Sequence, residues 1–122
     1  MATLSEKEAK DIVKDLLTII RRGIDMNGTA AITIAGMEEA FDPVLREGNT
    51  SDVYCKIAGA TSEHGLSTDI QPSMYHGMVM RFGPAGPKYK KPSPEICEKR
   101  WRKVKNHPWV LSYEQGLTDS TD

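Results

Sequence analysis

Residues 73–82, SMYHGMVMRF, carry the clearest β-strand pattern in the sequence and indicate that the fold contains a sheet. Successive side chains of a strand alternate between its two faces. One face would hold Met74, His76, Met78, Met80 and Phe82, and the other would hold Tyr75, Gly77, Val79 and Arg81. We expect both faces to be at least partly covered, because both carry apolar side chains. The methionine row is typical of core filling, with a ligand-binding surface as the alternative.

Residues 6–22, on the N-terminal side, form the firmest helix prediction. Seven apolar side chains recur there at spacings of three and four and would line one face: Ala9, Ile12, Val13, Leu16, Leu17, Ile19 and Ile20. Ser5 and Glu8 have the spacing of a capping box, and Gly23 suits the left-handed position after a helix. We expect this amphipathic helix to pack on the protein's own sheet, with packing on another copy of the chain as the alternative.

A second helix is predicted on the C-terminal side, over residues 94–105. Ser93 can cap it, Pro94 suits the first helical position, and Glu95 lies at the positive end of the helix dipole. The helix should end before Pro108, because the residue ahead of a proline is disfavoured in helical geometry. The apolar stripe of this helix would consist of Ile96, Cys97, Trp101 and Val104.

Three shorter stretches are predicted as further strands. Residues 29–35 (TAAITIA) and 52–58 (DVYCKIA) have a two-residue periodicity, and residues 109–113 are a candidate final strand. Residues 52–58 also fit a helical turn after a Ser51 cap, so both structures stay open there, with the strand favoured.

The remaining segments are predicted as connections. A short helix is expected over residues 37–41, ended near Pro43. Residues 59–72 are polar and contain Gly65 and Pro72, which predicts a long loop. Residues 83–87 (GPAGP) are expected to form a turn.

The chain of 122 residues has room for one domain, which we expect to span 1–122 with frayed ends at 1–4 and 114–122. Hydrophobic residues make up 39% and charged residues 27%, an ordinary globular composition that excludes a disordered or fibrous chain. The predicted fold is α+β. It combines an N-terminal amphipathic helix, a mixed or antiparallel sheet of three or four strands, and a basic helix near the C-terminus.

The net charge of −1 conceals an asymmetry along the chain. Residues 1–75 carry 7 basic and 12 acidic side chains, whereas residues 76–122 carry 9 basic and 5 acidic ones. Between 88 and 105, Glu95 and Glu98 oppose eight cations: Lys88, Lys90, Lys91, Lys99, Arg100, Arg102, Lys103 and Lys105. A helix that buries Trp101 must turn its cations to solvent, which predicts a basic patch. Three aromatic residues are interleaved with these cations in the sequence: Tyr89, Trp101 and Trp109.

We expect this patch to be the contact surface of a non-catalytic binding protein, with nucleic acid as the first partner class. Lysine and arginine neutralise phosphates, and an aromatic ring can stack on an unpaired base. The competing interpretation is a solvated helix face, which the sequence pI near 6.3 supports. A small regulator or inhibitor that docks on an acidic protein, and a homodimer that pairs the patch with its acidic half, are further alternatives.

A catalytic interpretation is weaker. Cys55, His64, Asp69 and His76 could supply a thiolate, a base and an orienting acid, but the sequence does not place them together. A buried cysteine, a turn histidine and a strand histidine are the ordinary alternatives for three of them. The glycine-rich nucleotide-binding motifs and the GxSxG hydrolase motif are absent from the sequence. We therefore expect neither an enzyme nor a cofactor.

The cellular location is predicted from two features that the sequence lacks, a membrane-spanning segment and a signal peptide. It contains no run of about 18 to 20 apolar residues, and its N-terminus does not resemble a signal peptide, so we expect a cytoplasmic protein without membrane contact. Cys55 and Cys97 lie 42 positions apart without CxxC spacing, which favours reduced thiols over a disulfide. The cysteines and histidines show no zinc-ligand spacing, so no metal is expected.

Overall fold

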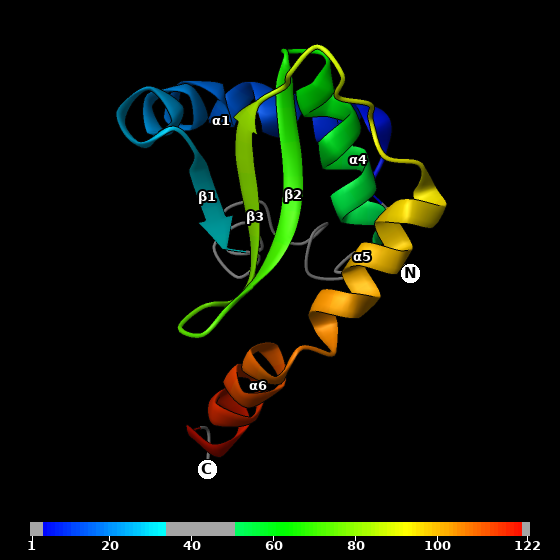
Figure 1. The fold of residues 1–122 in the computed structure, drawn as a ribbon. Coiled ribbons are helices and arrows are strands. Elements are labelled where there is room, and N and C mark those ends of the chain that lie inside the picture. Colours follow the sequence, from blue (N-terminus) through cyan, green and yellow to red (C-terminus); the bar gives the residue numbers. More distant parts are fainter. Residues whose placement is uncertain (1–3, 34–50, 121–122) are drawn as a thin grey trace.

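The computed structural model describes residues 4–33 and 51–120, which form the α+β fold that the sequence predicts. Its elements are α1 (Glu6–Asn27), β1 (Ala30–Thr33), α4 (Ser51–Ser62), β2 (Leu66–Ser73), β3 (Gly77–Pro84), α5 (Pro94–Lys105) and α6 (Pro108–Ser120). The three strands form one sheet, with α1 and α4 packed on the same side of it (Figure 1). The helix expected over residues 37–41 lies outside the described residues.

The sheet is antiparallel, with β3 in the centre between β1 and β2. Met80 of β3 lies opposite Ile32 of β1 and Ile70 of β2, so the strands bring apolar side chains to one face. Met78, Met80 and Phe82 are buried there, which confirms that these methionines fill the core. The predicted strand over 29–35 is confirmed for the residues of β1.

Strands β2 and β3 form a hairpin, which corrects the expected start of the central strand. Met74, Tyr75 and His76 form the turn of this hairpin, and β3 begins only at Gly77. Gly77 has a φ of 76°, a left-handed conformation that glycine adopts without strain. The alternation seen from residue 73 onward therefore combines a turn and a strand.

The prediction of a loop over residues 59–72 is wrong, because this segment holds the end of α4 and most of β2. β2 buries Leu66, Thr68 and Ile70 on the core face. Its alternation is hard to see in the sequence, because polar Thr68 takes a core position and Pro72 lies inside the strand. β2 is an edge strand within the described sheet, where a proline is tolerated.

Helix α1 is longer than predicted, and its end is different. The capping box is confirmed: the Glu8 amide donates to Ser5 Oγ at 3.0 Å, and the Ser5 amide donates to Glu8 Oε1 at 3.1 Å. The helix continues past Gly23 to Asn27, and Gly28 takes the left-handed position after it, with a φ of 82°. Gly23 instead lies against β1, where an added Cβ would be 2.7 Å from Ala30 Cβ.

The strand favoured over residues 52–58 is wrong, because Ser51–Ser62 is the helix α4. α4 packs against the sheet, α1 and α5. Its buried side chains are Val53, Tyr54, Ile57, Ala58, Ala60 and Thr61, most of them at helical spacing. A two-residue pattern read over only seven positions does not separate the two structures, and packing against the core selects the helix.

Helix α5 spans Pro94–Lys105 as predicted, with the Ile96 amide donating to the Ser93 cap at 3.3 Å. Cys97, Trp101 and Val104 are buried, but Ile96 is exposed and does not belong to the buried stripe.

The C-terminal strand expected over 109–113 is wrong, because these residues lie in α6, which continues to Ser120. Leu4 is completely buried, and residues 114–120 continue the helix. Residues 1–3 and 121–122 lie outside the described residues. In Figure 1, α6 lies near the hairpin turn between β2 and β3. An added Cβ on Gly77 would be 2.6 Å from the Tyr113 ring, so the hairpin and α6 approach each other closely here.

Candidate nucleic-acid interface

The buried side of α5 determines which of its side chains face solvent. Trp101 is only 8% exposed, and Cys97 and Val104 lie on the same stripe, against α4 and β2. Because a helix turns by about 100° per residue, Lys99, Lys103 and Asn106 then project from the opposite side. The inward orientation of Trp101, on which the basic patch depends, is therefore present.

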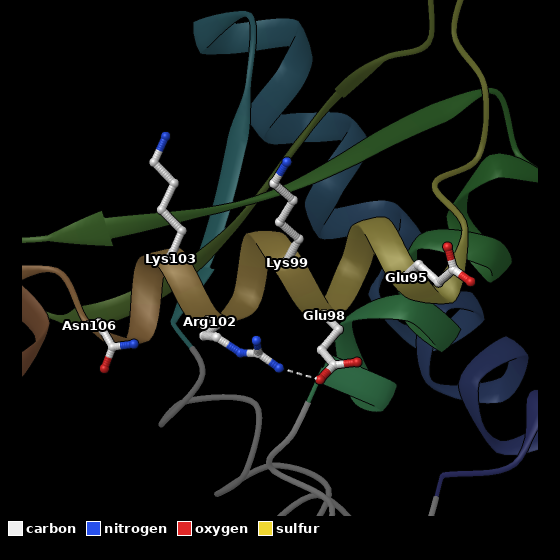
Figure 2. A pocket seen from close by; sticks show the side chains of 6 residues that line it. All are labelled: Glu95, Glu98, Lys99, Arg102, Lys103 and Asn106. Carbon is white, nitrogen blue, oxygen red and sulfur yellow. Dashed lines mark hydrogen bonds and ion pairs between the residues drawn. The ribbon is translucent and has the colours of Figure 1, made fainter.

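The outer side of α5 holds an open depression of about 560 Å³. The described residues that line it are all charged or polar: Glu95, Glu98, Lys99, Arg102, Lys103 and Asn106. Figure 2 shows Lys99 and Lys103 extending together to one side of the helix, while Glu98 and Arg102 lie on the other. Arg102 Nη2 and Glu98 Oε1 form an ion pair at 2.6 Å, so this cation is partly neutralised.

The remaining cations of this surface are not neutralised by the part of the chain that the structure describes. Over residues 4–33 and 51–120, Lys99, Lys103 and Lys105 take part in no ion pair. Lys99 and Lys103 are also one turn apart, an arrangement in which like charges destabilise a helix by about 0.2 to 0.5 kcal/mol. Lys103 and Lys105 lie in the last turn, where the helix dipole offsets part of this repulsion.

Arg100 differs from the other cations because it is bound to the protein's own core. Its Nη1 donates a hydrogen bond to the Tyr54 hydroxyl at 3.2 Å, and that hydroxyl donates to the Thr68 carbonyl at 3.5 Å. Burial raises the pKa of Tyr54, so the hydroxyl stays neutral, and the hydrogen bond raises the pKa of Arg100. Arg100 therefore joins α5 to α4 and has fewer donors left for a partner.

The segment before α5 carries three lysines of the predicted patch. Lys88, Lys90 and Lys91 are all exposed, and Lys91 also lies beside Gly59 of α4 and lines a separate pocket of about 190 Å³. Tyr89 is half-buried, and its hydroxyl is enclosed without a hydrogen-bond partner among the described residues. The structure thus does not present the Tyr89 hydroxyl beside the α5 cations.

Trp109, which the sequence analysis expects among the aromatic side chains of the basic patch, lies on α6 in the structure. It lies in the first turn of α6, three residues after Asn106, and is 44% exposed. Its amide donates to His107 Nδ1 at 3.1 Å, and the two rings meet edge to face at 5.0 Å. The sequence predicts a strand over 109–113, so it is the start of a helix at Pro108, and not the presence of Trp109 near the patch, that the sequence does not indicate.

The structure does not assemble the candidate catalytic group. His64 lies in the turn before β2 and His76 in the turn after it, so the length of the strand, about 25 Å, separates them. Both histidines are exposed. Asp69 lies between them on β2, where its carboxylate accepts bonds from the Ile70 amide and the Gln71 side chain. Cys55 lies on α4, in the pocket with Lys91.

Over residues 4–33 and 51–120, no group of three or more histidine, cysteine, aspartate or glutamate side chains is placed to hold a metal ion. None of the helices within those ranges combines the length and the apolar character that a membrane span requires. Comparison of the chain with models of protein families, with curated proteins and with solved structures found no match.

Proposed function

We propose that this protein is a non-catalytic binding protein that holds nucleic acid on the outer side of α5. The observation that carries the proposal is the set of cations turned outward by the buried Trp101. Lys99 and Lys103 extend together to one side of α5, and within the described residues neither forms an ion pair. Arg102 lies on the other side of the helix, paired with Glu98, and Lys105 is an exposed cation of the last turn. Phosphates spaced along a strand would relieve the repulsion among these cations.

The composition of this surface favours nucleic acid over an acidic protein. The cores of protein interfaces are depleted of charge and enriched in apolar and aromatic side chains. The described lining of the α5 depression is entirely polar or charged, which suits the wet, positively charged interfaces formed with nucleic acids. Trp109 supplies an exposed ring near the end of the helix, on which an unpaired base can stack.

Binding of labelled single-stranded and duplex oligonucleotides, followed by fluorescence anisotropy, tests the proposal. Three phosphate contacts predict that affinity for duplex weakens roughly 40-fold between about 50 and 200 mM salt. The double variant Lys99→Glu/Lys103→Glu should lose binding. The matched variant Lys7→Glu/Lys14→Glu reverses two exposed lysines of α1 and should bind as the unchanged protein does.

A labelled polyglutamate peptide is the comparison ligand. Binding of the peptide at salt concentrations where neither oligonucleotide binds would overturn the proposal in favour of an acidic protein partner. The absence of oligonucleotide binding at low salt would also overturn it, as would an equal loss in both double variants.

A further inference from the structure

Cys55 on α4 and Cys97 on α5 are distant in sequence but belong to two helices that pack against each other. Cys55 is half-exposed and lines the smaller pocket together with Lys91 and Pro94, the first residue of α5. Cys97 lies one turn further along α5 and is completely buried, with its Sγ 3.9 Å from the Pro92 carbonyl oxygen. Side chains of a helix lean toward its N-terminus, so the Cys97 thiol points back toward the segment that Cys55 faces.

The electrostatics of Cys97 agree with this placement. Burial and a side-chain hydrogen bond with Cys55 raise the pKa of Cys97 to about 12. Both thiols are free in the structure. One of them is reached through the pocket, whereas the other is enclosed by the core.

We propose that Cys55 and Cys97 are a reversible oxidation site, at which a hydroperoxide converts the two thiols into a disulfide that joins α4 to α5. This proposal is independent of the proposed function. The Cys55 thiolate attacks one oxygen of the peroxide bond, forms a sulfenic acid, and releases the other oxygen as an alcohol or water. The Cys97 sulfur then attacks the Cys55 sulfur and expels the hydroxyl group, which leaves with the Cys97 proton as water.

The two cysteines have different roles in this oxidation reaction. Cys55 is the accessible thiol that meets the oxidant, because it lines the pocket. Lys56 and Lys91 line the same pocket. Cys97 is the resolving thiol, protected from the oxidant by its burial. The disulfide would close a loop of 42 sequence positions and constrain the unfolded chain, so the oxidised protein should melt at a higher temperature.

Treatment of the folded, full-length chain with hydrogen peroxide tests the proposal. The chain is then denatured, its remaining thiols are alkylated, and its mass and peptides are measured. The expected result is the loss of both alkylation sites together, a monomer lighter by two hydrogen atoms, a peptide pair linked through Cys55 and Cys97, and full recovery with a dithiol reductant. The melting temperature should rise on oxidation and fall again on reduction.

Two variants separate the roles of the thiols. Cys97→Ala should leave Cys55 as a sulfenic acid that dimedone traps, whereas Cys55→Ser should leave Cys97 unoxidised. Circular dichroism compares the fold of each variant with that of the unchanged protein. If Cys97→Ala does not fold, Cys55→Ser still tests the proposal, because it changes only the half-exposed cysteine. The proposal is overturned if Cys97 of the unchanged protein stays available for alkylation while Cys55 is oxidised, or if only disulfides between chains form.

Discussion

At the scale of single residues, two positions in close contact with other elements constrain the fold most clearly. Tyr54 is completely buried and yet forms two hydrogen bonds, one from Arg100 and one to the Thr68 carbonyl. Gly77 combines a left-handed backbone with close approach of the Tyr113 ring. A sequence pattern identifies the glycine as a turn signal, but the tyrosine behind it follows only from the position of α6.

Gly77→Ala should lower the free energy of unfolding by about 1 to 3 kcal/mol, because the methyl group adds backbone strain and a clash with Tyr113. Gly28→Ala is the matched control, since Gly28 has a similar φ of 82° but no atom within 4 Å of an added Cβ. Gly28→Ala should lower the free energy of unfolding only by the cost of backbone strain, about 1 kcal/mol. Urea denaturation measures both variants, and equal losses would contradict the contact with α6.

The thiol of Cys97 predicts a loss of stability at alkaline pH. Its pKa is raised to about 12 in the folded chain, above the ordinary value of 9.0, so the folded state holds the proton more tightly than the unfolded state does. The protonated Cys97 thiol therefore contributes fully to the free energy of unfolding below about pH 9. Above that pH its contribution falls by up to about 1.4 kcal/mol per pH unit. Denaturation between about pH 8 and 10 should show a steeper decline for the unchanged protein than for Cys97→Ala. Parallel declines would contradict the prediction.

At the scale of elements, the sequence predicts those helices whose signals are local. Ser5 with Glu8 and Ser93 with Pro94 mark the starts of α1 and α5, and both starts are confirmed. α4, β2 and α6 are mispredicted, because their short patterns fit more than one structure and contacts with distant segments decide between them. For the same reason, the sequence predicts the cations of α5 and Trp109 among them, but neither the helix that holds Trp109 nor the packing of Cys55 near Cys97.

The packing of α1 on β1 gives a prediction at this scale. Gly23→Ala would add about 1 kcal/mol of helix propensity, but its methyl group would lie 2.7 Å from Ala30 Cβ and should destabilise the protein overall. Ala30→Gly removes the opposing methyl group, so the double variant Gly23→Ala/Ala30→Gly should be more stable than the sum of the two single changes predicts. Additive effects in urea denaturation would show that α1 and β1 do not meet in this way.

At the scale of the whole molecule, α5 buries its apolar side chains in the core and turns lysines outward. α5 is anchored by Trp101 and by the bond from Arg100 to Tyr54, so its outer cations are held on a rigid element and not on a loop. A helix fixed in this way presents Lys99 and Lys103 with a constant spacing, which favours repeated contacts with the phosphates of one ligand. The account therefore depends on these two lysines acting together on a polyanion.

The dependence of duplex affinity on salt concentration tests most directly whether Lys99 and Lys103 bind phosphates. For the unchanged protein, Lys99→Ala/Lys103→Ala and the control Lys7→Ala/Lys14→Ala, the logarithm of the binding constant is plotted against the logarithm of the salt concentration. Removing two phosphate contacts should make the slope shallower by about 1.8 for the α5 variant and leave the α1 variant unchanged. Identical slopes for all three proteins would contradict the assignment of α5 as the nucleic-acid surface.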